Sequence, residues 1–168
     1  MKGRSLIAFP FAVLCLLSAC SPQPEAPAPE PEGIHAPPEL TVCFDQGNCT
    51  ALRGGWSWTV REGENQYSST IADSLHPLES QDLTPTLTTA ETEITLSFRM
   101  EPDTITAQCW PESAWGNQDA QSQEAAVEGN LLTLNPGGYL YDIHAAWNAM
   151  PDYEGECSYS FFVRYTPN

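Results

Sequence analysis

Basic residues are scarce in this sequence. Lys and Arg together number 6 against 22 Asp and Glu, which gives a formal net charge of −16, and Lys2 is the only lysine. Because affinity for nucleic acids depends on neutralising phosphates with basic side chains, this composition argues against nucleic acid as a partner. The acidic composition favours solubility and leaves room for a basic or cationic partner.

The sequence also lacks an apolar run long enough to cross a membrane. Its apolar stretch, residues 5–17, falls short of the roughly 20 residues of a spanning helix and follows Lys2 and Arg4, the pattern of a secretory signal. The stretch ends in Leu-Ser-Ala-Cys at 17–20, which resembles the lipobox of bacterial lipoproteins. This resemblance implies a signal peptide at 1–19 and a lipid on Cys20 that anchors an extracytoplasmic protein to the bacterial membrane. The alternative is ordinary secretion with an unmodified Cys20.

A proline-rich segment follows the lipobox. Residues 21–39 interleave proline with glutamate and alanine. Proline has no backbone N–H to donate, so this stretch cannot continue a helix or a sheet interior. We expect 20–39 to be a lipidated, disordered linker and 40–168 to be one folded domain.

Helical periodicity is missing from the domain, whereas period-two alternation is clear. Apolar and polar residues alternate over 56–61, 92–100, 139–147 and 158–165, and weaker strands are expected at 40–44, 67–72, 104–109 and 131–134. Only 118–126 could form a turn or two of helix. Short strands with turns about every ten residues predict an all-β fold, an immunoglobulin-like β-sandwich of seven to nine antiparallel strands rather than a barrel.

Several strand and turn segments resemble a known group of proteins. They are Gly-Trp-Ser-Trp at 55–58, Ala-Asp-Ser-Leu-His-Pro-Leu at 72–78, and the alternating segments at 94–98, 139–147 and 159–163. In these segments the chain resembles uncharacterised small lipoproteins of Clostridia with an immunoglobulin-like domain. The resemblance implies an extracytoplasmic sandwich and no particular activity. The cysteines of the domain depart from that pattern.

The domain contains four cysteines and no Cys-x-x-Cys spacing. Cys15 lies in the signal peptide and Cys20 is the lipid site, which leaves Cys43, Cys49, Cys109 and Cys157. In an exported domain four cysteines suggest two disulfides, with three possible connectivities. We favour Cys43 with Cys49 and Cys109 with Cys157. A zinc site is the weaker alternative, because the histidines are scattered.

No set of residues has the spacing of a catalytic centre. Asp73, Ser74 and His76 are the residue types of a hydrolytic triad, but their crowding before Pro77 is more typical of a capped turn. His144 is expected to pair with a carboxylate of a neighbouring strand. We predict neither a metal site nor a cofactor.

Aromatic residues in polar segments are the best candidates for ligand binding. Trp110 and Trp115 flank a loop-like stretch, and Tyr153 lies in another. Exposed aromatic rings stack on sugars or anchor protein partners. The alternative is that Trp110 ends its strand in the core while Trp115 folds back over the sheet.

These observations predict a non-enzymatic binding or interaction module of the cell envelope. Its partners would be the membrane, through the lipid, and an envelope protein or a glycan, and we expect a monomer. The alternatives are an enzyme-associated or weakly hydrolytic domain and a structural spacer.

Overall fold

The computed structural model of the chain describes residues 35–148 and 150–167. The predicted signal peptide at 1–19, the lipid site at Cys20 and the linker up to residue 34 lie outside the described residues. Within the described part, no helix is both long and apolar enough to cross a membrane.

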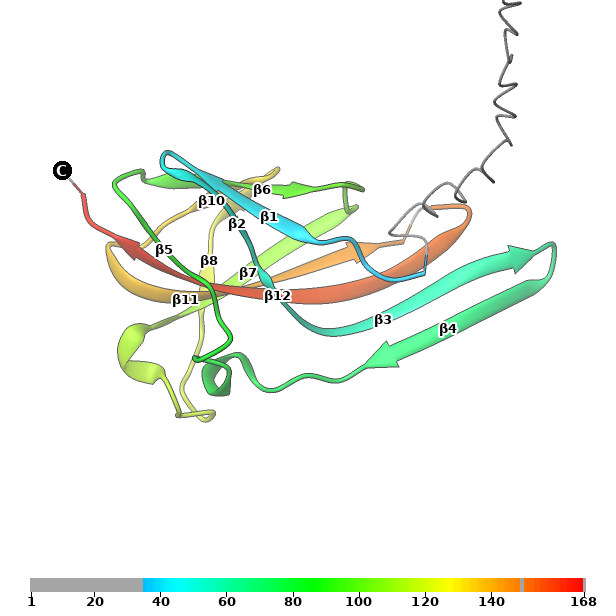
Figure 1. Cartoon of the computed structure of the whole chain (residues 1–168), viewed down its shortest axis with the longest axis horizontal. Helices are drawn as coiled ribbons and strands as arrows, with labels where there is room; N and C mark the ends of the chain where they lie inside the picture. Colours follow the sequence, from blue (N-terminus) through cyan, green and yellow to red (C-terminus); the bar gives the residue numbers. More distant parts are fainter. Residues whose placement is uncertain (1–34, 149, 168) are drawn as a thin grey trace, which may run out of the picture. The chain divides into compact units, whose positions relative to one another are not determined.

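The described residues form two sheets (Figure 1). The five-stranded sheet has the order β2-β1-β6-β10-β9 and contains β1 (Leu40–Phe44), β2 (Gly47–Thr50), β6 (Glu93–Phe98), β9 (Val127–Glu128) and β10 (Leu131–Thr133). The seven-stranded sheet has the order β4-β3-β12-β11-β7-β8 and contains β3 (Leu52–Gly63), β4 (Gln66–Ala72), β5 (Thr86–Thr89), β7 (Thr104–Pro111), β8 (Gln123–Ala125), β11 (Gly137–Trp147) and β12 (Tyr153–Tyr165). All pairs are antiparallel except β5, which pairs with β12 in parallel.

Alternating apolar residues build one core between the two sheets. In β11 the predicted inward face is fully buried at Tyr141, Ile143 and Trp147, and β6 contributes Leu96 from the opposite sheet to the same cluster. Side chains of a strand point alternately to the two faces, so this burial places the sheets face to face. The all-β prediction is confirmed.

The strands outnumber the seven to nine that the sequence predicts. The additional strands β2, β5, β8 and β9 are only two to four residues long, too short to show an alternation of their own. The 118–126 segment contains no helix and instead includes β8, which pairs with β7.

A second apolar cluster covers the outer face of the seven-stranded sheet. Leu140 and Phe162 lie between inward-facing residues and therefore point outward, where they pack with Trp110. Two short 3₁₀ helices, η1 (Pro77–Glu79) and η2 (Glu112–Ala114), lie over this face (Figure 1). They add Leu78 and Ala114 to the cluster. The long connections therefore act as a cover for the sheet.

The folded part begins before Leu40. Pro37 and Pro38, which the sequence assigns to the linker, are buried. The hydroxyl of Tyr159 on β12 donates a hydrogen bond to the carbonyl of Pro38. These contacts tie the end of the proline-rich segment to the core.

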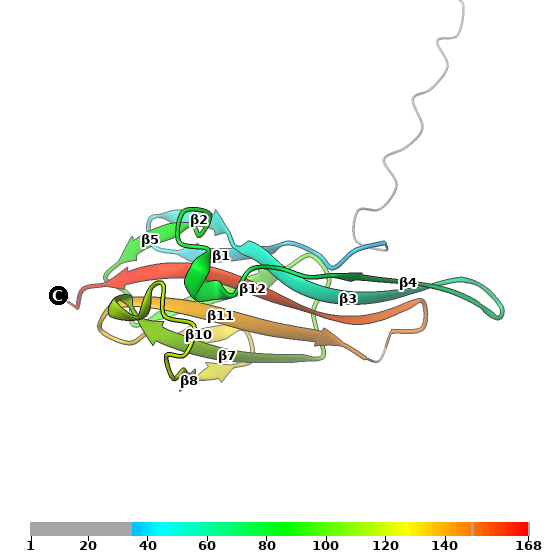
Figure 2. The ribbon, with the colours of Figure 1, turned by 90° about the horizontal axis from the view of Figure 1, so that it is seen from below.

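The β3–β4 hairpin projects beyond the five-stranded sheet. Figures 1 and 2 both show its turn extending past the ends of the neighbouring strands. β4 lies at the edge of the seven-stranded sheet and pairs only with β3 among the described strands. Among the described strands, none of the five-stranded sheet covers the tip of this hairpin.

Candidate functional site

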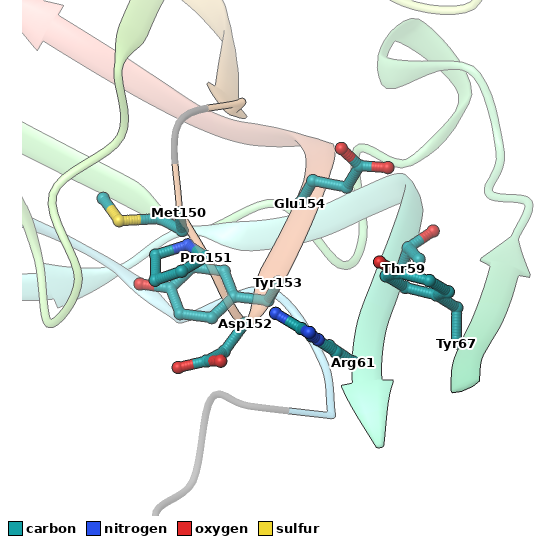
Figure 3. Close-up of a pocket in the computed structure, with 8 residues that line it drawn as sticks. All are labelled: Thr59, Arg61, Tyr67, Met150, Pro151, Asp152, Tyr153 and Glu154. Atoms are coloured by element: carbon teal, nitrogen blue, oxygen red, sulfur yellow. The ribbon is translucent and has the colours of Figure 1, made fainter. Parts of the chain in front are cut away.

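A hollow of about 420 Å³ lies where the β3–β4 hairpin meets the β11–β12 connection. We call it the hairpin pocket. Its lining residues are Thr59, Arg61, Tyr67, Met150, Pro151, Asp152, Tyr153 and Glu154. Figure 3 shows Thr59 and Tyr67 on one side, Met150, Pro151 and Tyr153 on the other, and Arg61 with Asp152 between them.

The backbone of the hairpin pocket is held by the ladder between β3 and β12. Tyr153 pairs with Val60 and Glu154 with Thr59, and the amide of Arg61 donates to the carbonyl of Asp152 over 2.8 Å. The wall that β3 and β12 form therefore belongs to paired backbone, whereas Met150, Pro151 and Asp152 belong to the connection between β11 and β12.

Arg61 is the basic group of the hairpin pocket. Its Nε and Nη2 donate to the carbonyls of Gly63 at 3.0 Å and Glu64 at 3.2 Å, which fixes the guanidinium against the hairpin turn. Asp152 and Glu154 supply acceptors close by in the same lining. A fixed guanidinium with carboxylate acceptors in the same lining can orient a polar ligand.

The two tyrosines of the hairpin pocket point to opposite faces of the sheet, because Tyr67 pairs with Arg61 whereas Tyr153 pairs with the core residue Val60. The Tyr153 ring stacks on Trp58, with centroids 5.3 Å apart and planes at 18°. Trp58 in turn meets Trp147 edge to face within the core. Tyr67 is 66% exposed and is therefore free to contact a ligand. The exposed ring of Tyr67 beside polar groups suits a sugar or a peptide.

Gly155 allows the close contact between β12 and β3 beside the pocket. It pairs with Trp58, and a Cβ atom at this position would lie 2.6 Å from Cε3 of that indole. Only glycine therefore lets Trp58 reach the position from which it supports Tyr153.

The structure places the predicted aromatic residues in different environments. Trp110 is 3% exposed, and its Nε1 donates to the carbonyl of Ala120 over 3.1 Å. Trp110 is thus a core residue and is not accessible to a ligand. Trp115 is partly buried against the outer cluster, with its ring 5.9 Å from that of Phe162. This arrangement matches the alternative stated from the sequence, in which Trp110 ends its strand in the core and Trp115 folds back over the sheet.

Trp115 and Tyr153 do not share a surface. Trp115 packs on Phe162, which is nine residues beyond Tyr153 along β12. At the usual rise of a strand this separation is roughly 30 Å. Tyr153 alone among the predicted candidates lines the hairpin pocket.

Arg61, Tyr67, Met150 and Asp152 are pocket residues that sequence reasoning missed. The signal for two of them is present: the turn after residue 61 makes Arg61 and Tyr67 cross-strand partners. An exposed tyrosine on an otherwise polar strand is the second clue. The contribution of the β11–β12 connection depends on tertiary packing.

The residues of the hypothetical triad serve as turn and cap groups. Nδ1 of His76 accepts the amide of Leu78 over 3.2 Å and so caps η1. Oγ of Ser74 donates to the carbonyl of Leu75 over 3.2 Å. Asp73 lies in the same irregular segment between β4 and η1. The described hydrogen bonds therefore join Ser74 and His76 to the backbone, as a turn requires, and not to each other.

A cavity of about 90 Å³ on the outer face contains Ser74 and Asp142. Burial raises the pKa of the Asp142 carboxyl, and this is only partly offset by a hydrogen bond from Gln108 and by the nearby His144 and His76. The cavity is too small for a drug-sized ligand, which needs roughly 300 Å³ or more.

His144 pairs with a carboxylate on the neighbouring strand, as predicted. Its Nε2 lies 3.5 Å from Oε2 of Glu156 on β12, and both side chains are about half exposed. The pair is a surface contact far from the requirements of a metal site. Within residues 35–148 and 150–167, no three His, Cys, Asp or Glu side chains gather in a way that could hold a metal ion.

All four cysteines of the domain are free thiols, so the predicted disulfides are absent. On the β1–β2 hairpin Cys43 pairs with Asn48 while Cys49 pairs with Val42. Side chains of adjacent pairs point to opposite faces, which separates the two thiols.

Cys109 and Cys157 are also too far apart to form a bond. They flank β11 opposite Tyr141 and Ala145, which lie four residues apart. Strand rise and spacing then separate their Cα atoms by roughly 17 Å. A disulfide needs less than about 7 Å. The strands that carry the two cysteines, β7 and β12, do not pair with each other, because β11 lies between them.

Comparisons of the chain with protein-family models, curated proteins and solved structures found no match.

Proposed function

We propose that this chain is a non-enzymatic binding module of the bacterial cell envelope, which holds its ligand in the hairpin pocket. The observation that carries the proposal is the pocket itself, in which the exposed ring of Tyr67 lies beside Arg61, Asp152 and Glu154. Aromatic faces with fixed polar groups recognise sugars and peptides. The ligand is accordingly a glycan or a peptide segment of an envelope protein, and the module acts as a monomer without a cofactor.

The sequence supports a location outside the cytoplasm. The signal-like start and the lipobox-like ending at Cys20 favour export and lipid attachment, and the proline-rich segment supplies reach from the membrane. The lipid anchor can be tested by growing cells that express the chain in medium with labelled palmitate. The label should enter the wild-type protein and should be absent from Cys20→Ser. Equal labelling of both proteins, or of neither, contradicts the lipid anchor.

The finer fold assignment is also a proposal. Two face-to-face sheets with a core of alternating residues favour an immunoglobulin-like sandwich. An experimental structure in which strand order and connections differ from that topology would contradict it.

The binding test uses residues 21–168, which retain the whole compact unit Pro31–Asn168 and both apolar clusters. We would screen this protein against cell-wall glycans, peptidoglycan fragments and envelope proteins. Tyr67→Ala removes an exposed ring of the pocket. Leu83→Ala is the matched control, because Leu83 is 64% exposed, close to the 66% of Tyr67, but lies outside the pocket.

Saturable binding that Tyr67→Ala weakens by about tenfold, with Leu83→Ala unchanged, is the expected result. Equal loss in the two variants would place the ligand elsewhere. Absence of binding to the whole panel would favour a spacer. Hydrolysis of a panel member that Ser74→Ala abolishes would establish the enzymatic alternative instead.

A further inference from the structure

The outer edge of β4, residues Gln66–Ala72, is an open sheet edge. No described strand pairs with it, and its seven residues include no charge and no proline. Proteins usually block such edges with charged residues, proline, bulges or short strands, because the unpaired N–H and C=O groups accept another strand. β4 uses none of these means within its length.

Other sheet edges in the described part are shorter. β2 has four residues, β8 three and β9 two, and the last two carry Glu124 and Glu128. β4 is therefore the edge best able to take up an added strand.

Exposed apolar side chains accompany this backbone. Tyr67 is 66% and Ile71 77% exposed, and both lie on the same face of β4 because they are four residues apart. A strand added beside β4 would place its own side chains against these two. Main-chain hydrogen bonds would give affinity and the alternate side chains specificity.

The charge around the edge indicates the chemistry of the partner. Glu62 and Glu64 precede β4 and Asp73 follows it, within a chain of net charge −16. Arg61 is directed to the turn carbonyls, where it is already hydrogen-bonded. A second copy, paired antiparallel about Ser69, would set Tyr67 against Ile71 but would also bring Asp73 opposite Asn65, the residue next to Glu64, of the other copy. A segment with basic ends avoids this repulsion.

We propose that β4 binds an extended polypeptide segment of another protein, with an uncharged centre of alternating β-branched residues and basic residues at its ends. The proline-rich segment of this chain is excluded as the occupant, because proline cannot complete a ladder. This inference rests on the proposed role as a binding module. It uses a surface that differs from the hairpin pocket in all but Tyr67.

The test uses residues 21–168 and a fluorescent synthetic peptide of sequence Lys-Lys-Thr-Val-Thr-Val-Thr-Val-Thr-Lys-Lys. One control peptide carries Glu in place of Lys, and a second carries N-methyl groups on alternate amides. We expect saturable binding by fluorescence anisotropy and slower amide exchange within Gln66–Ala72. Both control peptides should bind at least about tenfold more weakly, and salt should weaken binding of the basic peptide.

Proline substitutions locate the interaction on the edge. Of two consecutive residues in β4 only one directs its N–H to β3, so one of Ser68→Pro and Ser69→Pro should retain the wild-type unfolding temperature. That variant should lose the peptide. Glu154→Gln, which alters only the hairpin pocket, should retain it.

The inference would be overturned by equal binding of the N-methylated peptide, by retention of the peptide by the folded proline variant, or by no binding of the basic peptide. Protection of β4 that depends on protein concentration in the absence of peptide would identify a second copy as the occupant and would also overturn it. If a ligand of the hairpin pocket binds but the peptide does not, the proposed function stands and only the inference about the β4 partner is refuted.

Discussion

Replacing Gly155 with alanine tests how the hairpin pocket is built. The added Cβ would lie 2.6 Å from Cε3 of Trp58 and closer still to the carbonyl oxygen of Ser57. Ordinary carbon contacts are about 3.5 to 4.0 Å, so one of the two strands must move by roughly 1 Å. The substitution therefore disturbs the pairing of β12 with β3.

The cost follows from how firmly Trp58 is held. Its ring is fixed by Trp147 and by Tyr153, each with centroids 5.3 Å away, and it is 2% exposed. Since the indole cannot turn aside, we expect a loss near the upper end of the usual overpacking range, about 3 kcal/mol. For a domain of this size, that corresponds to a fall in unfolding temperature of about 10 °C.

Thermal unfolding followed by circular dichroism measures the loss. Gly63→Ala is the control, because a Cβ there meets its nearest atom at 3.6 Å, an ordinary contact. It should be neutral or slightly stabilising. The reasoning is refuted if Gly155→Ala unfolds within about 2 °C of the wild type, since the close contact would then not exist.

Further predictions concern a buried acid, the thiols and the outer cover. Burial raises the pKa of Asp142, so the stability due to its protonated form is complete below its ordinary value of 3.8 and is lost as the pH rises through the raised value. Asp142→Asn should therefore gain unfolding temperature relative to the wild type between about pH 4 and pH 7, and a constant difference would contradict this. Burial also raises the pKa of Cys157 to about 11. The buried thiols should react with Ellman's reagent only after unfolding, and a mass deficit showing disulfides in the native protein would contradict the free-thiol arrangement. Trp115→Ala should lower stability by about 1 to 2 kcal/mol through lost packing on Phe162, yet leave pocket binding unchanged; loss of binding with an unchanged unfolding curve would restore Trp115 as a ligand contact.

The inner core was predictable because its residues alternate over long strands. Tyr141, Ile143 and Trp147 are buried as their period of two requires, and Tyr159 and Phe161 follow the same rule on β12. Such a pattern depends only on which face meets the other sheet, and the sequence carries that information locally.

The outer cluster could not be read from alternation. Phe162 and Leu140 occupy positions that the period assigns to the polar face, and they are buried because the long connections fold over them. The disulfide prediction failed for a related reason. Whether Cys109 meets Cys157 depends on the register of two strands on either side of β11, which neither strand encodes alone.

The candidate site was predicted only at Tyr153. A sequence shows that a tyrosine lies near a turn, but not that the hairpin of β3 and β4 will stand beside it. Arg61 and Tyr67 reach the pocket because the hairpin projects past the five-stranded sheet (Figure 1). That projection is set by strand lengths on two different sheets.

The most direct test of the binding role is titration of the first ligand found in the envelope screen into residues 21–168, with Tyr67→Ala and Leu83→Ala beside the wild type. Tyr67→Ala should lose about tenfold in affinity, while the affinity of Leu83→Ala and the unfolding temperatures of both variants should equal those of the wild type. Undiminished binding by Tyr67→Ala would contradict the assignment of the hairpin pocket as the ligand site.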